Sequence, residues 1–564
     1  MSWIFGYFGK GVGKQINSPE IPLYYFKDSK FILFAGGNKQ TCFFRSESQS
    51  SCWAVAGVGL KSTDYSFRVC DTDEWDALLT ANKKNFRSLN GHFTVIKYSE
   101  GKLKFFTDEL GLREIYIVQL SDGFGFTTRI DWLKHFIDPE LDLVEFGSRW
   151  LLQNQISGKS IIKNVIRLVC ASASIRNHIL SIEQNPWKPD FEIKSNSKTF
   201  DSVLTNILSI RDKNISLSLS GGLDSRLLLS YLAKKDFNLW ETHTFGDPNH
   251  PDSRIACDLL KGLNRKNEII DDKTFVNDKL IEQLKSYAVQ SIVTNPASAI
   301  LNLRFYDRLT GRNKIIIDGG FGEIWRKAFA NRLLLIGRSA LLKRNSKSVS
   351  GLLRYRRADI FNKEAFIEME KGISEQFDAF FEDMPVTEQL RPERWIELFS
   401  IRTRLTNYYA PEQSRIDQFV ISFMPLVQKD VLNLLFGLDN SEKNNGKMFK
   451  QLIKQNSSVL TKQALVKGNI IHPFNASSLG SRIHLRLKNK IGLSFKSEVY
   501  RELFSSLKEF IGDTVHSAEV RNYEYYDRVK IERMMSNFLS GEEKYNSEID
   551  WFLSFELFRQ GISK

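Results

Sequence analysis

The chain has 564 residues, of which 42% are hydrophobic and 26% charged, and its 79 Lys and Arg against 66 Asp and Glu give a net charge of +13. This length excludes a single compact core, so we expect two or three domains, and the composition is ordinary for a folded protein. The charge suits an anionic partner, such as a nucleotide, a nucleic acid or a lipid head group, or simply a basic surface.

The first part of the chain, residues 1–187, is rich in strand-like runs. They include FILFAG, CWAVAGVGL, HFTVIKY, LKFFTD and IYIVQL, which are separated by turns such as LNG and SDG. This pattern predicts two strand layers with a few helices. A polar stretch with two prolines, NPWKPDFEIKSNSK, follows, and it indicates a linker that we place at residues 188–199.

From residue 200 onward, strand-like runs alternate with helical ones. ISLSLS, THTF and KIIID have strand character, and SRIACDLLKGL is typical of a helix. This alternation predicts a parallel sheet wrapped by helices. After about residue 325 the pattern becomes mostly helical. We therefore expect residues 200–564 to form a second, α/β domain.

A glycine-containing turn, residues 220–225 with the sequence SGGLDS, follows the strand that ends near Ser218. Glycines let the backbone approach an anion closely, and the start of the following helix offers N–H groups and a positive dipole end. Asp224 would repel bare phosphate but suits a magnesium ion that bridges phosphates. Two glycines alone also suit a plain connection, whereas the whole hexapeptide favours phosphate.

The stretch LSLSGGLDSRLLLSYL resembles the pyrophosphate-binding loop of the N-type ATP pyrophosphatases, most closely asparagine synthetases and their relatives. It lacks the Gly-Lys-Ser/Thr ending of a Walker loop. Residues 242–263 are similar to the family's second ATPase strand and its Pro-Asp helix start, where Asp252 can cap the helix. KIIIDGGFGEIWRKAF lies where the family has a strand and then Gly-Glu-Gly-Ser-Asp-Glu, and LVKGNIIHP where it has Lys-x-Gly-Phe.

The front of the chain resembles the class II glutamine amidotransferases. MSWIFGYFG is similar to their Met-Cys-Gly-Ile-Phe-Gly start, and residues 89–118 follow their Leu-Asn-Gly-x-Phe and Asp-x-x-Gly-x-x-Pro-Leu-Tyr signatures. Together the two resemblances imply an α/β protein. An N-terminal Ntn-like αββα sandwich would be followed by a parallel-sheet PP-loop ATPase domain with a helical C-terminal region.

The resemblance also implies site residues. Lys467 falls on the family's catalytic lysine, with Lys462 as the competing lysine of that segment, and Glu323 is a second catalytic candidate. The family's second magnesium carboxylate falls on Gly322, so magnesium would be held by Asp224 together with Asp318, and either Asp318 or Glu323 would replace the missing carboxylate. Asp318 also suits a strand-end turn, and Glu323 a solvated or capping position. The residues implied to bind ATP and its pyrophosphate are Ser218, Ser220, Gly221, Gly222, Leu223, Asp224, Ser225, Thr244, Phe245, Asp318 and Gly319.

Other positions depart from the family's pattern. Ser2 replaces the N-terminal cysteine nucleophile, and a hydroxyl is far less ionised than a thiol, although it can act with its own α-amine as base. Asn90 and Gly91 match an oxyanion-hole pair and also suit a β-turn. We therefore expect Ser2, Asn90 and Gly91 to be a vestigial glutaminase site on a retained scaffold. The glutamate that shapes the family's acceptor pocket is here Gly319, so asparagine synthesis itself is not implied.

The resemblance implies an ATP- and Mg²⁺-dependent, AMP-forming carboxylate–amine ligase. Members that lack the cysteine, the β-lactam synthetases and lasso-peptide cyclases, suggest small-molecule or peptide carboxylate and amine substrates. The pathway would make a peptide, a secondary metabolite or a surface glycan. Two alternatives stay open: a non-catalytic nucleotide-binding scaffold, and a PP-loop enzyme acting on RNA, against which the front half argues. A homodimer is also left open.

Cysteine usage and hydropathy predict the compartment. The five cysteines are scattered without a Cys-x-x-Cys pair, which argues against a disulfide framework or a zinc site. No apolar run approaches about 18 residues, and the first ten residues lack the features of a secretory signal. We therefore expect a cytoplasmic protein without a membrane span. We also expect Arg226 to face outward or onto phosphate, and the basic run RYRR at residues 354–357 to be solvated.

Overall fold

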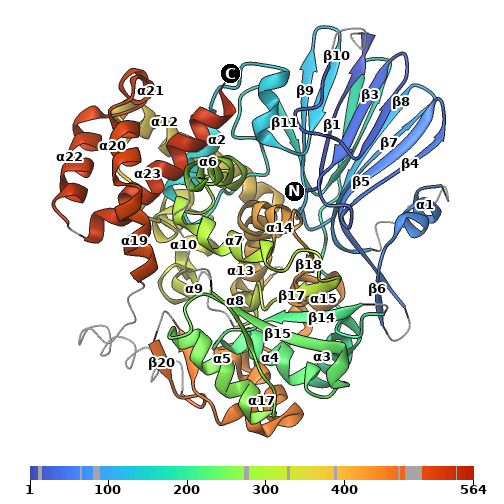
Figure 1. The fold of residues 1–564 in the computed structure, drawn as a ribbon, viewed down its shortest axis with the longest axis vertical. Helices are drawn as coiled ribbons and strands as arrows, with labels where there is room; N and C mark the ends of the chain where they lie inside the picture. Colours follow the sequence, from blue (N-terminus) through green and yellow to red (C-terminus); the bar gives the residue numbers. More distant parts are fainter. Residues whose placement is uncertain are drawn as a thin grey trace.

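The computed structural model describes residues 1–10, 16–63, 66–80, 89–211, 213–271, 279–326, 331–386, 390–467, 470–476, 498–541 and 543–563. In these ranges the chain is mixed α/β. Its first third forms antiparallel sheets, its middle forms a parallel sheet, and helices predominate in the remainder (Figure 1). The sequence has a second dense basic run, RIHLRLKNK at residues 482–490, which lies outside the described residues.

Two antiparallel sheets pack face to face in the first third of the chain. One has the order β11-β9-β10-β1-β3-β2, and the other has the order β13-β12-β8-β7-β5-β4 with β6 beside β5. Buried apolar side chains from both, including Ile4, Leu33, Ile96 and Phe105, share one cluster, as expected of a sandwich. The predicted two strand layers are confirmed. The strands are β1 Trp3–Gly9, β2 Tyr24–Lys27, β3 Phe31–Gly36, β4 Cys42–Ser48, β5 Ser51–Ser62, β6 Phe67–Val69, β7 Asn90–Ser99, β8 Lys102–Thr107, β9 Ile115–Leu120, β10 Gly123–Thr127, β11 Val165–Leu168, β12 Ala171–Arg176 and β13 Ile179–Gln184.

The parallel sheet has the order β16-β15-β14-β17-β18 in the described residues. Its chain path runs from β14 outward through β15 to β16 and then crosses to β17 and β18 on the other side. The carboxyl ends of β14 and β17 therefore border a topological switch point, the place where open α/β sheets bind ligands. The runs ISLSLS, THTF and KIIID lie in β14, β15 and β17, as predicted. The strands are β14 Asn214–Ser218, β15 Trp240–Phe245, β16 Glu268–Ile270, β17 Lys314–Ile317 and β18 Ile421–Phe423, with a separate ribbon of β19 Leu465–Lys467 and β20 Ile470–His472.

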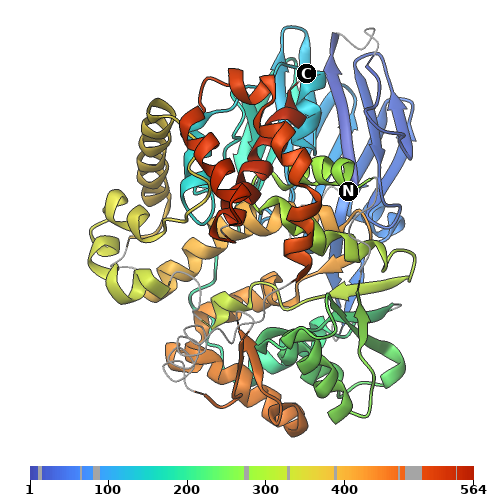
Figure 2. The same ribbon diagram turned by 60° about the vertical axis from the view of Figure 1, so that its left-hand side comes forward.

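Helices cover the parallel sheet and fill the C-terminal part of the chain. Figure 2 shows the last helices, in red, beside the blue and cyan strands of the first third, and Lys134 of that third donates to the Gly561 carbonyl. The helices are α1 Thr72–Thr80, α2 Leu143–Leu151, α3 Ser197–Ile207, α4 Leu223–Leu232, α5 Pro251–Gly262, α6 Leu280–Ser291, α7 Ile300–Asp307, α8 Gly322–Trp325, α9 Asn331–Ile336, α10 Arg338–Leu342, α11 Ser346–Leu352, α12 Lys363–Asp383, α13 Pro392–Ser400, the π-helix Ile401–Tyr409, α14 Ala410–Ile416, α15 Lys429–Gly437, α16 Asn440–Lys443, α17 Lys447–Asn456, α19 Glu498–Ser506, α20 Lys508–Val515, α21 Ala518–Asn522, α22 Arg528–Leu539 and α23 Glu543–Ile562.

One of the apolar clusters that join the two halves of the molecule lies between the front sheets and α4. It contains Val58 and Leu60 of the antiparallel sheets together with Leu217 of β14 and Leu229 of α4. The parallel sheet is thus packed against the front sheets through shared core residues. Across the described ranges, none of the helices is both long and apolar enough to cross a lipid bilayer.

Two basic side chains lie elsewhere than we expected. Arg226 is fully buried and donates to the Leu460 and Ala464 carbonyls, because the chain after α17 covers this face of α4. Its expected outward or phosphate-facing position is therefore wrong. Within the run RYRR, Arg357 is buried and donates to the Trp150 carbonyl, so this run is only partly solvated.

Candidate functional site

The loop of residues 220–225 connects β14 to α4 at the switch point. The Ser220 and Ser225 hydroxyl oxygens lie 3.0 Å apart, and the Gly222 N–H donates to Ser220 Oγ at 3.2 Å. Gly222 provides no side-chain cap for α4, so the first turn of this helix presents its N–H groups and positive dipole end at the loop. This geometry suits a bound anion.

Two later segments hold the loop in place. The Gly221 N–H donates to Asp252 Oδ1 at 2.8 Å, and the Gly221 carbonyl accepts from the Val466 N–H at 3.0 Å. A Cβ on Gly221 would overlap the Val466 side chain, so this close approach requires glycine. The expectation that Asp252 caps α5 is wrong: His250 is the capping residue, because its Nδ1 accepts the Asp252 N–H.

The ribbon strand β19 brings Lys467 to the edge of the loop. Val466 is hydrogen-bonded to Gly221, and Lys467 follows it directly with an exposed side chain. Because successive side chains of a strand point to opposite faces, Val466 packs on the loop while Lys467 points away from that contact. Lys462, the competing lysine, is exposed just before this ribbon.

An arginine binds the carboxylate of Asp224. Arg326 Nε donates to Oδ1 at 2.7 Å and Arg326 Nη2 to Oδ2 at 2.6 Å, the paired geometry in which guanidinium binds carboxylate most strongly. Gly322 lies four residues before Arg326 and packs on the same carboxylate, so that a Cβ on it would overlap the Asp224 carboxyl carbon. Burial raises the pKa of Asp224, and Arg326 opposes that shift.

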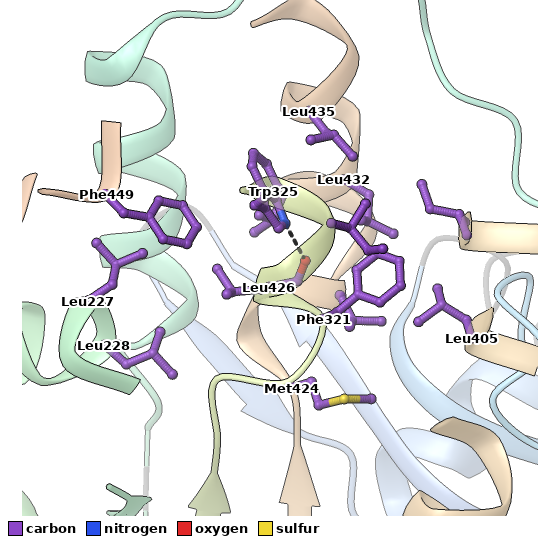
Figure 3. Close-up of a cluster of buried hydrophobic side chains, with 14 of the residues drawn as sticks. Leu227, Leu228, Phe321, Trp325, Leu405, Met424, Leu426, Leu432, Leu435 and Phe449 are labelled. Carbon is purple, nitrogen blue, oxygen red and sulfur yellow. Dashed lines mark hydrogen bonds between the residues drawn. The ribbon is translucent and has the colours of Figure 1, made fainter. Parts of the chain in front are cut away.

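Apolar packing fixes the short helix α8 that carries Gly322 (Figure 3). Phe321 and Trp325 belong to one buried apolar cluster, and Trp325 Nε1 donates to the Leu426 carbonyl at 3.2 Å. Phe321 has φ of 68°, an unusual value for an aromatic residue, and its N–H donates to the Tyr409 hydroxyl at 3.2 Å. Arg326, directly after α8, is therefore held over Asp224 by its neighbours.

The π-helix Ile401–Tyr409 binds the carboxylate of Glu323. Arg404 Nε donates to Glu323 Oε1 at 2.9 Å, and the Tyr409 hydroxyl donates to the same oxygen at 2.8 Å. Glu323, predicted as a catalytic residue, is thus engaged in an ion pair. π-Helical segments are rare and often lie at functional sites.

Asp318 and Gly319 follow β17 and meet the loop. Asp318 Oδ1 accepts the Gly320 N–H at 2.6 Å, and burial raises the pKa of Asp318 to about 6. Gly319 packs on the start of α4, where a Cβ would lie 2.7 Å from the Ser225 nitrogen. Gly319 therefore lies against the start of α4, and Asp318 directly precedes it in the chain.

The other predicted nucleotide-binding residues differ in their surroundings. The buried Thr244 hydroxyl donates to the Leu219 carbonyl at 2.7 Å, and Phe245 stacks on Phe305 with ring centroids 5.2 Å apart. The Leu223 side chain is buried in the core, so only its backbone can face a ligand. Ser218 is half-buried at the end of β14.

These residues do not fit a magnesium ion at Asp224. Both Asp224 oxygens bind Arg326, Gly322 offers no ligand, and the Glu323 carboxylate is paired with Arg404. The described part of the chain contains no group of three or more His, Cys, Asp or Glu side chains that could hold a metal ion. Magnesium requires several oxygen ligands in near-octahedral geometry. The surroundings of Asp224 therefore do not suit a magnesium ion.

Ser2 lies in a buried polar junction, a group of hydrogen-bonded polar side chains between the two halves of the molecule. It is fully buried, and its Oγ accepts from Arg113 Nη2 at 2.8 Å and from the Thr41 hydroxyl at 3.0 Å. Arg113 also pairs with Asp417 at 3.0 Å, and His92 Nε2 lies 2.9 Å from the other oxygen of Asp417. All five side chains are buried, so Ser2 is surrounded by protein groups that occupy its hydroxyl.

The pair Asn90 and Gly91 is occupied in the same way. The Gly91 N–H donates to the Gln428 side-chain oxygen at 2.9 Å. Asn90 donates to Asp430 at 2.9 Å and accepts the Lys429 N–H at 2.7 Å. The groups that would form an oxyanion hole therefore bind the second half of the same chain.

Comparison with protein-family models and with curated proteins finds no match for this chain. The chemistry of the site has to be inferred from its own residues.

Sequence reasoning missed Arg326, Arg404 and Tyr409. The spacing of Gly322 and Arg326 is a usable signal, because residues four apart share a helix face. No comparable signal marks Arg404 or Tyr409, because each lies more than eighty positions after Glu323 in the sequence.

Proposed function

We propose that this chain is an AMP-forming ligase that uses ATP to join a carboxylate to an amine or to ammonia. The observation that carries the proposal is the loop of residues 220–225 at the switch point between β14 and β17, with Lys467 directly after its Val466 contact. A parallel sheet with this loop after its central strand supports the PP-loop arrangement that the sequence resembles. Two packed antiparallel sheets likewise support an Ntn-like front domain.

In this proposal the N–H groups of the first turn of α4 and the loop hydroxyls bind the β- and γ-phosphates. A carboxylate oxygen of the substrate attacks the α-phosphorus, the bond to the bridging oxygen breaks, and pyrophosphate leaves. Lys467 and the loop donors stabilise the charge that grows on the phosphoryl oxygens. An amine then attacks the acyl carbon of the adenylate, gives up a proton and expels AMP, and the amide is formed. Holding the amine beside the adenylate supplies much of this second step.

The nitrogen in this proposal comes from free ammonia or from an amine-bearing substrate rather than from glutamine. Ser2 is buried, and Asn90 and Gly91 already bind residues of the second half. The two substrates that the enzyme joins are then a small-molecule or peptide carboxylate and an amine.

A pair of lysine variants tests the ligase. The protein is incubated with ATP and a panel of carboxylates and amines, and AMP and pyrophosphate are measured. We expect Lys467→Met to slow pyrophosphate release by about 10²- to 10³-fold, the usual loss for one preorganised charge-stabilising group. The matched control, Lys462→Met, should release pyrophosphate at the wild-type rate.

Two results would contradict the ligase. ADP and phosphate as products would indicate a different phosphoryl transfer. Binding of ATP without turnover across the panel would favour a non-catalytic nucleotide-binding protein, for which the pairing of Asp224 and Glu323 with arginines is the favouring observation.

A further inference from the structure

The charge balance at the loop differs from that of a metal-dependent nucleotide site. Asp224 and Glu323, two of the three carboxylates that the sequence suggests for a metal ion, pair with Arg326 and Arg404. Each carboxylate therefore already has a counter-charge inside the protein. A guanidinium keeps its charge at any physiological pH and forms fixed, paired hydrogen bonds.

The site also has no room for the missing carboxylate. The Gly322 backbone packs so closely on Asp224 that any side chain at this position would displace it. Gly322 and Arg326 are one helical turn apart, and the Arg326 N–H closes that turn on the Gly322 carbonyl. In this turn Gly322 provides no side-chain ligand for a metal ion, and Arg326 provides a positive charge.

One nitrogen of the Arg326 guanidinium does not bind Asp224. Its Nε and Nη2 bind Asp224, whereas Nη1 has no hydrogen-bond acceptor within the described residues, and 24% of the side-chain surface is exposed. A second cation, Lys450, lies on α17, whose start packs on Arg326, since a Cβ on Gly446 would lie 3.1 Å from Arg326 Cδ. With the exposed Lys467, these groups place positive charge around the loop.

We infer that Arg326 takes the place of a divalent metal ion in this site, and that the loop binds a nucleoside triphosphate without magnesium. The inference rests on the proposed function, because it names the cation that the same phosphate loop uses. The pair with Arg326 gives Asp224 a counter-charge, so that this carboxylate does not repel phosphate as a bare anion would, and the pair orients Arg326 Nη1. In a metal-dependent site, the ion would perform both tasks.

The test is equilibrium binding of ATP, measured by titration calorimetry with excess MgCl₂ and again with EDTA. We expect the two wild-type affinities to agree within about twofold, roughly 0.4 kcal/mol. In Arg326→Ala, Asp224 becomes a bare carboxylate beside the phosphates. We expect its affinity in EDTA to fall at least about tenfold, roughly 1.4 kcal/mol, and magnesium to restore much of the loss through the freed Asp224.

Two further variants complete the design. Arg338→Ala removes an exposed arginine of α10 and should bind ATP like the wild type in both buffers. Arg326→Lys keeps a positive charge but loses the paired geometry, so binding should weaken and stay independent of magnesium. If Arg326→Ala does not fold, the inference is still tested by the ATP affinities of the wild type and of Arg326→Lys, each measured with MgCl₂ and with EDTA.

The outcomes separate the inference from the proposed function. ATP that binds the wild type only with magnesium overturns the inference and leaves the ligase proposal standing. ATP that binds in neither buffer overturns the ligase proposal and the inference with it.

Discussion

Gly322 and Asp224 show how the absence of one side chain changes the surroundings of a neighbouring carboxylate. The sequence reveals that Gly322 stands where the resembled family has a carboxylate, and it identifies the loop of residues 220–225 through its local pattern. It does not reveal that Arg326 binds Asp224. That ion pair joins residues about a hundred positions apart, and its geometry depends on how Phe321 and Trp325 pack.

Gly322→Ala is expected to destabilise the protein, because its Cβ would overlap the Asp224 carboxyl group. Overpacking a well-packed site of this kind typically lowers the free energy of unfolding by about 1–3 kcal/mol. Urea unfolding followed by tryptophan fluorescence measures the change. The control is Gly351→Ala in α11, where a Cβ would have open space and should be neutral or stabilise by up to about 1 kcal/mol. Equal midpoints for Gly322→Ala and the wild type would contradict the close packing.

The π-helix Ile401–Tyr409 connects the front half to α8. Thr406 donates to the Leu110 carbonyl of the front half at 3.3 Å, while Arg404 and Tyr409 hold Glu323. The helical character of this region is predictable from sequence, and so are strands such as β9 and β14. The π-geometry is not, since hydrophobic periodicity does not distinguish a π-helix from an α-helix over nine residues.

Tyr409→Phe tests the contact between the π-helix and α8. The change removes the hydroxyl that accepts from the Phe321 N–H and donates to Glu323. A buried N–H left without a partner costs about 1–3 kcal/mol of the free energy of unfolding. The matched control is Tyr408→Phe, which keeps the ring 4.3 Å from the Arg404 guanidinium and should change stability little. Similar urea midpoints for both variants would show that the Tyr409 hydroxyl does not hold α8.

The two halves of the molecule share a core and a buried polar junction. The domain boundaries at residues 1–187 and 200–564 stay predictions, because composition marks a linker but cannot show how much two parts are packed together. Val58 and Leu217 belong to one apolar cluster, and Asp417 binds Arg113 and His92. Such contacts depend on the tertiary arrangement of segments that no local pattern relates.

Asp417→Asn is expected to loosen this junction. The change keeps the shape of the side chain but leaves the buried Arg113 without its counter-charge, which typically costs about 3–5 kcal/mol of the free energy of unfolding. The control is Glu140→Ala, which breaks an exposed pair with Lys163 and should cost at most about 1 kcal/mol. Urea unfolding measures both variants. A loss for Asp417→Asn no larger than that of the control would show that the junction contributes little to stability.

The contact between Gly221 and Val466 joins two segments that the ribosome synthesises at different times. The loop is made early, but the strand that fixes its carbonyl is made more than two hundred residues later. At translation rates of about 5–20 residues per second, this delay is roughly 10 to 50 seconds. During this interval the loop of residues 220–225 lacks the strand that fixes the Gly221 carbonyl, and the loop gains its final shape only when Val466 packs onto it.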